Sequence, residues 1–166
     1  MKTVITILII YLVALFSVTL LPRMSIFSAM PKIVLVLSLL FLFHKDFKNA
    51  LIWASVGGLF LDFLDTGFPY NILLSTAIIL LSWYLIKRFF ESSNIYIFLI
   101  FCFFGGFLYD LVFFGAHHLN PLTYPVVLNA IYTTIAGFIF ALIYVQFQKR
   151  VSKKLTLVHW EPDDRL

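Results

Sequence analysis

Apolar residues along the chain are gathered into six long runs, which short polar segments separate. The runs cover residues 3–21, 25–43, 49–64, 71–86, 95–114 and 126–147. A helix needs roughly 20 residues to cross the hydrocarbon core of a bilayer, which is about 30 Å thick. The pattern therefore predicts an all-α integral membrane protein: a bundle of six transmembrane helices over residues 1–147, with a short cytoplasmic tail over residues 148–166.

The first two runs need separate interpretation. The first is longer than the apolar region of a signal peptide, which has about 7–15 residues, and no convincing cleavage site follows it, so a retained helix is predicted. The second contains Pro31, which breaks a helix interior but suits the first position of a helix. The second span is therefore predicted to be either short, starting at Pro31, or kinked, with Lys32 snorkelling outward.

Composition supports a lipid environment. Of the 166 residues, 62% are apolar and 12% are charged, and the mean hydropathy is +1.01. A soluble domain averages about 45–50% apolar and about 25% charged residues. The net charge of +4 is spread in short clusters between the apolar runs, without a nucleic-acid-binding motif. Membrane lipid, and no nucleic acid, is therefore the expected partner. The single cysteine, Cys102, cannot form an internal disulfide.

The basic residues predict the topology, because cytoplasmic segments of membrane proteins are enriched in Lys and Arg. With the N-terminus inside, only Arg23 and Lys32 fall in outer segments. The remaining basic residues fall inside: Lys2, Lys45, Lys48, Lys87, Arg88, Lys149, Arg150, Lys153, Lys154 and Arg165. The sequence thus predicts a multi-pass membrane protein with both termini in the cytoplasm.

Two stretches, residues 51–67 and 99–115, resemble each other. In the second stretch, Gly57, Gly58, Asp62 and Gly67 of the first recur as Gly105, Gly106, Asp110 and Gly115. Adjacent glycines allow helix backbones to approach closely in lipid, and the last glycine of each copy is expected to cap a helix C-terminus. The two copies predict tandem helix hairpins. Gly137 lies on one helix face with Thr133 and Ala141, either a packing face or a docking face for a partner helix.

The carboxylates in the spans are the strongest candidates for a functional site. Asp62 and Asp65 share a helix face, and Asp110 is the repeat counterpart of Asp62. We expect Asp62 and Asp110 to cap neighbouring helix N-termini, so that Asn would largely replace Asp. A partner or ligand site, and proton or peptide chemistry, are the alternatives. Adjacent His117 and His118 lack a third metal ligand. No catalytic, cofactor or metal-binding residue is assigned, and a non-enzymatic protein is expected.

Residues 31–84 resemble the rod shape-determining protein MreD family. The resemblance rests on the proline that opens the second span and on a block joining the third and fourth spans, formed by Gly58, Leu59, Asp62, Gly67 and Pro69. It implies a scaffold of the bacterial cell-elongation and peptidoglycan-synthesis machinery that binds an MreC-like bitopic protein. Through this protein it would contact MreB and the RodA–transpeptidase pair, without catalysis or cofactor.

The chain also looks like the substrate-binding subunits (S components) of ECF-type vitamin transporters, which have six spans and a similar size. Those subunits dock on their transporter through an A-x-x-x-A patch on the first span, where this chain has only Ala14. A vitamin-binding subunit is the alternative function.

Cysteine labelling tests the predicted topology. Lys2→Cys, Lys87→Cys and Lys153→Cys are expected to be shielded from a membrane-impermeant thiol reagent added outside the membrane, and His117→Cys is expected to react. Labelling of Lys87→Cys from outside would contradict the six-span arrangement.

Overall fold

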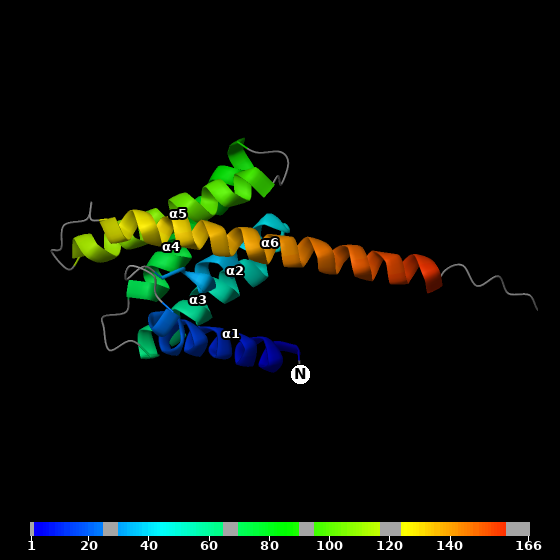
Figure 1. Ribbon diagram of the computed structural model, residues 1–166, viewed down its shortest axis with the longest axis horizontal. Helices are drawn as coiled ribbons and strands as arrows, with labels where there is room; N and C mark the ends of the chain where they lie inside the picture. The colour runs from blue at the N-terminus through cyan, green and yellow to red at the C-terminus, as the bar shows by residue number, and fades with distance from the viewer. Residues whose placement is uncertain (1, 25–29, 65–69, 90–94, 117–123, 159–166) are drawn as a thin grey trace, which may run out of the picture.

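The protein is all-helical in the part of the chain that the structure describes. The structure is a computed structural model, and it describes residues 2–24, 30–64, 70–89, 95–116 and 124–158. These residues contain no strand, and their helices pack side by side (Figure 1). In chain order the elements are α1 (Lys2–Thr19), the 3₁₀ helix η1 (Leu21–Met24), α2 (Ile33–Phe43), α3 (Phe47–Leu64), α4 (Tyr70–Phe89), α5 (Ile95–Ala116) and α6 (Tyr124–Val158).

Four helices, α3 to α6, are long and apolar enough to cross a membrane, whereas the apolar stretch Val4–Thr19 of α1 and the helix α2 are shorter. Large apolar side chains lie on the surface, among them Phe63, which is 77% exposed, and Tyr96, which is 71% exposed. Water is a poor solvent for such a surface. The helix lengths and the exposed apolar surface together fit a multi-pass membrane protein.

Helix α2 is the shortest α-helix and lies at the centre of the bundle. Its 11 residues are about 16 Å long at 1.5 Å per residue. It contacts α1, α3, α4, α5 and α6. A helix that is apolar on all sides is stable when it is surrounded by others, and most residues of α2 are buried. The helix begins at Ile33 rather than at Pro31, so the second apolar run contains a short helix.

The hairpins α3–α4 and α5–α6 have the most extensive contacts between helices. Glycines lie at both contacts. A Cβ atom built on Gly58 would lie 2.6 Å from the Cα of Ile72 in α4. A Cβ built on Gly106 would lie 3.2 Å from the Cβ of Thr133 in α6. The second glycine of each Gly-Gly pair therefore faces the other helix of its own hairpin.

The first glycine of each pair faces other helices. A Cβ on Gly57 would lie 2.5 Å from Val34 Cγ1 in α2, and one on Gly105 would lie 3.3 Å from Ile78 Cγ2 in α4. Gly137 of α6 packs on α5, where a Cβ would lie 2.9 Å from the sulfur of Cys102. The Gly-Gly pairs thus bring helices together on two sides.

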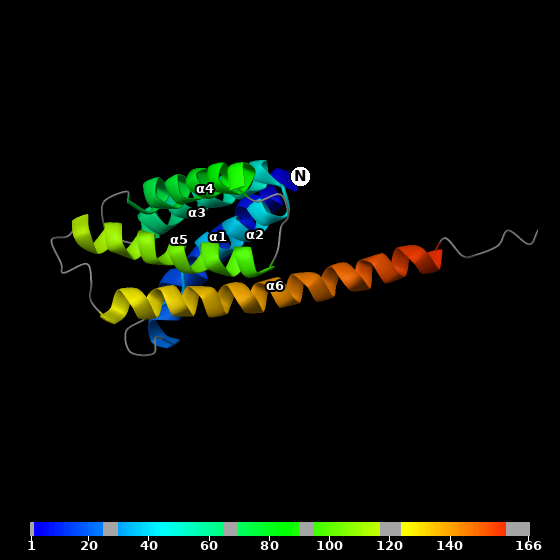
Figure 2. The ribbon, with the colours of Figure 1, turned by 90° about the horizontal axis from the view of Figure 1, so that it is seen from above.

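Helix α6 continues past the boundary expected between bundle and tail. It extends to Val158, so the first part of the predicted tail continues the last helix. Figures 1 and 2 show this helix projecting beyond the bundle, at the end where the N-terminus lies. Residues 159–166 lie outside the described residues.

Gly58→Ala tests the close contact between α3 and α4. The added methyl group would meet the backbone of Ile72 at 2.6 Å. We expect a loss of about 1–3 kcal/mol from overpacking, against a gain of about 1 kcal/mol in helix propensity. Gly106→Ala is the matched control, because its methyl group meets only a side chain, at 3.2 Å. Thermal unfolding in detergent should show a lower Tm for Gly58→Ala than for Gly106→Ala, and equal values would contradict the contact.

Candidate functional site

Asp62 joins α3 to the N-terminus of α4. The backbone N–H groups of Asn71 and Ile72 donate hydrogen bonds to Oδ1 and Oδ2 of Asp62, at 2.9 and 3.0 Å. The first N–H groups of a helix lack partners within the helix, and a carboxylate at this end also interacts favourably with the helix dipole. This is the capping role expected for Asp62.

A polar cluster extends from this cap across three helices. The hydroxyl of Tyr109 in α5 donates a hydrogen bond to Oδ1 of Asn71 in α4. The hydroxyl oxygen of Ser75, also in α4, lies 2.8 Å from the carbonyl oxygen of Ala54 in α3. Side chains of α4 therefore link the first hairpin both internally and to α5.

Asp110 has a different environment from its repeat counterpart. Its side chain is 1% exposed, and Oδ1 lies 3.0 Å from Nζ of Lys32, whose side chain is 29% exposed. Neither Asp110 oxygen accepts a well-directed hydrogen bond from the described residues, so charge attraction holds the pair together. The Lys32 ammonium also lies 4.8 Å from the ring centroid of Tyr109. The prediction that Lys32 snorkels outward is wrong, because the buried carboxylate attracts the ammonium into the bundle.

The residues just before α2 are fixed to α6. The N–H of Met30 donates to Oδ1 of Asn129 at 2.7 Å, and the N–H of Lys32 donates to Oγ1 of Thr133 at 3.1 Å. Backbone that is not helical must find other partners where no water is available. Sequence reasoning did not find these partners for Asn129 and Thr133. Pro31 is the feature of the sequence that indicates such contacts, because a proline interrupts the helix and the backbone around it then needs side-chain partners.

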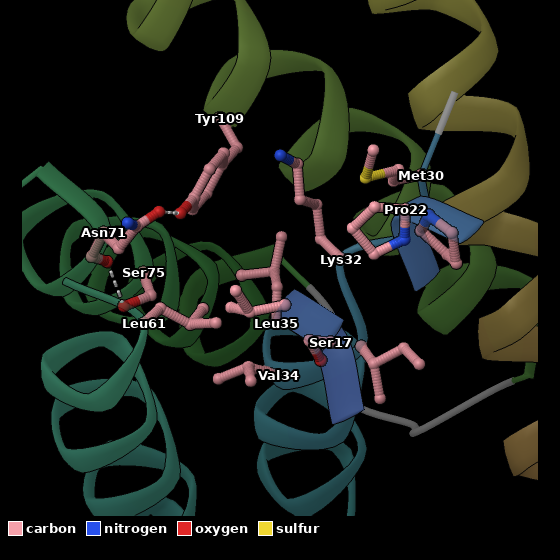
Figure 3. A pocket seen from close by; sticks show the side chains of 13 residues that line it. Ser17, Pro22, Met30, Lys32, Val34, Leu35, Leu61, Asn71, Ser75 and Tyr109 are labelled. Carbon is pink, nitrogen blue, oxygen red and sulfur yellow. Dashed lines mark hydrogen bonds between the residues drawn. The ribbon is translucent and has the colours of Figure 1, made fainter. Parts of the chain in front are cut away.

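A cavity of about 370 Å³ lies between these groups. It is bounded by the end of α1, the start of α2, and α3, α4 and α5 (Figure 3). Its polar lining comes from Ser17, Lys32, Asn71, Ser75 and Tyr109, and apolar side chains such as Leu61 form the rest. The cavity therefore combines a cation, an amide and hydroxyl groups with an apolar wall.

Several predicted site residues are not part of this arrangement. Asp65, Gly67 and Pro69 lie outside the described residues. Gly115 is the penultimate residue of α5, so it lies inside the helix rather than beyond its C-terminus as expected. Within the described ranges, no three His, Cys, Asp or Glu side chains come together as metal ligands.

The fold and the site define an all-helical protein with several helices of membrane-spanning length and a polar cluster buried among them. Comparisons of the chain with models of protein families, with curated proteins and with solved structures gave no match.

The two aspartates are expected to respond differently to substitution. Asp110→Asn removes the counter-charge of Lys32, and breaking such a buried pair costs about 3 kcal/mol. Lys32→Gln in the same chain should recover part of this loss, because an amide pair carries no net charge. Unfolding of the single and double variants, read as a double-mutant cycle, measures the coupling. A coupling near zero would contradict the ion pair.

Asp62 provides the matched comparison. Asp62→Asn keeps one oxygen that can accept a hydrogen bond from α4, so its loss of stability should be smaller than that of Asp62→Ala, about 0.5–2 kcal/mol. The expectation that Asn largely replaces Asp is thus retained for Asp62. It is withdrawn for Asp110, because the partner of Asp110 is a cation.

Proposed function

We propose that the chain is a non-enzymatic, six-span scaffold of the bacterial cell-elongation machinery in the cytoplasmic membrane. Its direct partner would be an MreC-like bitopic protein, through which it would contact MreB and the RodA–transpeptidase pair. The proposal starts from the resemblance of residues 31–84 to the MreD family. The structural role of the residues that carry this resemblance supports it.

The observation that carries the proposal is the structural role of Asp62, the acidic residue among the five that carry the resemblance. Both of its oxygens accept backbone hydrogen bonds from α4. A carboxylate bonded in this way is suited to fixing two helices and poorly suited to exchanging protons with a substrate. Gly58 of the same block lies at a close contact between those helices. The block therefore favours a structural element over a catalytic one.

The positions of the chain ends support the six-span topology. The N-terminus lies at the end of the bundle from which α6 projects (Figures 1 and 2). With the helices across a membrane, the N-terminus and the end of α6 would lie on one side, as the proposed topology requires. The paired packing of α3 with α4 and of α5 with α6 also fits the proposed tandem hairpins.

A vitamin-binding subunit of an ECF-type transporter is the second candidate, and the cavity beside α2 is the observation that favours it. Its volume of about 370 Å³ is at the small end of the range for ligand pockets, about 300–1,000 Å³. Mass spectrometry of small molecules extracted from the purified protein separates the two candidates, because a transporter subunit should carry a vitamin.

Photo-crosslinking in native membranes tests the scaffold. A photoreactive residue is placed at Leu8 of α1, Phe104 of α5 or Ile139 of α6, whose side chains are 56%, 57% and 50% exposed. We expect an MreC-like bitopic protein to be captured from one of these helices, because a docked partner covers one face and lipid covers the others. The faces that capture nothing are the matched controls. Failure to capture a bitopic protein at every face, in cells whose rod shape the variants maintain, would contradict the proposal.

A further inference from the structure

The N-terminus of α2 differs from that of α4 in how its N–H groups are satisfied. Asp62 caps α4 with both of its oxygens. Lys32, the N-cap residue of α2, makes no side-chain capping hydrogen bond. The N–H of Ile33 donates to the carbonyl of Pro31, and that of Val36 donates to the carbonyl of Lys32. No acceptor among the described residues takes the N–H groups of Val34 and Leu35.

These two N–H groups belong to residues that line the cavity. Val34 is 3% exposed and Leu35 is 2% exposed, and both contribute to the cavity wall. A buried backbone N–H without a partner is rare in native proteins and costs free energy comparable to a lost hydrogen bond. Water or a ligand in the cavity would supply an acceptor for these groups.

The open hydrogen-bond donors around the cavity and the dipole of α2 favour an anionic acceptor. The formal charges of Lys32 and Asp110 cancel, but the ammonium has three N–H donors, more than one contact to Asp110 uses. The uncapped N-terminus of α2 adds a partial positive charge of about half a unit. Asn71 contributes an amide to the same wall. Figure 3 shows the side chains of Lys32, Tyr109 and Asn71 around the cavity.

Apolar side chains also line the cavity. They include Val18, Pro22 and Leu61, which offer no hydrogen-bonding side chain and would exclude water from part of a ligand. A volume of about 370 Å³ fits a small molecule or one part of a lipid, by comparison with ligand pockets of about 300–1,000 Å³.

We propose that this cavity binds an amphiphile with an oxyanion head, a carboxylate or a phosphate. The head lies against the N-terminus of α2 and the Lys32 ammonium, and the apolar part lies against Leu61 and its neighbours. The proposed site does not depend on the scaffold role. Ligand binding is measured on the purified protein, and capture of the bitopic partner is measured in native membranes. The ligand comes either from the bilayer or from solution.

Calorimetric titration of the purified full chain in a non-ionic detergent tests the site. Decanoate and decan-1-ol are the probes, because they share a chain length and differ in the head group. Decanoate is expected to bind with 1:1 stoichiometry and about tenfold more tightly than decan-1-ol, since a hydrogen bond to a charged group is the stronger one. Equal affinities would overturn the proposal, because the cavity would then not distinguish an anionic head from a hydroxyl group.

Two variants locate the binding. Leu61→Trp fills part of the cavity and should weaken decanoate binding by about tenfold. Leu73→Trp, at a position 64% exposed, should leave it within about twofold. The double variant Lys32→Gln/Asp110→Asn keeps a polar pair but removes the ammonium, and should reduce the preference for decanoate over decan-1-ol. Unchanged decanoate binding in Leu61→Trp, or an unchanged preference in the double variant, would overturn the proposed site.

Lipid analysis of the purified protein distinguishes the two sources. Retention of phosphatidylglycerol by the wild-type chain and by Leu73→Trp, but not by Leu61→Trp, would identify the bilayer as the source. Decanoate binding without retained anionic lipid would identify a water-soluble oxyanion. Decyl phosphate, titrated in parallel, shows which of the two head groups the site prefers.

Discussion

The interruption of the second apolar run before Ile33 is the constraint from which much of the bundle follows. A chain that stops being helical among apolar neighbours exposes N–H and C=O groups that lipid cannot satisfy. Asn129 and Thr133 of α6 accept the hydrogen bonds of two of these N–H groups, which fixes α6 against the start of α2. The same interruption places Lys32 inside the bundle, where a charge needs a partner, and Asp110 of α5 provides it. The positions of α2, α5 and α6 relative to one another are therefore linked through a few polar contacts.

The two aspartates show that a repeated motif does not determine a repeated role. Asp62 and Asp110 occupy matching positions in similar stretches, and both follow a Gly-Gly pair that contacts other helices. Asp62 lies beside the N-terminus of α4 and accepts its N–H groups. Asp110 lies beside Lys32, whose charge outweighs any single N–H dipole at a distance of 3.0 Å. The different neighbours, which lie outside the repeated stretches, decide what each carboxylate does.

This contrast also explains how much of the structure could be predicted. The helices follow from the apolar runs, because hydrophobic patterning is a local property of the sequence. The cap by Asp62 was predictable because its N–H partners follow within the same hairpin. The contacts of Asn129 with Met30 and of Asp110 with Lys32 join residues that are distant in the sequence, and no local pattern specifies such pairs. The central position of α2 was equally hidden, since all six runs are apolar and only packing distinguishes them.

The uncapped N-terminus of α2 and the ion pair beside it cost free energy if they serve only to stabilise the fold. A Ser or Asp at the N-cap would satisfy one of the open N–H groups, yet the chain has Lys32 there, without a capping hydrogen bond. A buried ion pair is often no more stable than a well-packed apolar pair, yet Lys32 and Asp110 form one. Both departures from local stability lie next to the same cavity. Natural sequences tend to break local rules where function requires it. The proposed oxyanion would accept hydrogen bonds from the open N–H groups of α2 and from the Lys32 ammonium, and so links both departures to one function.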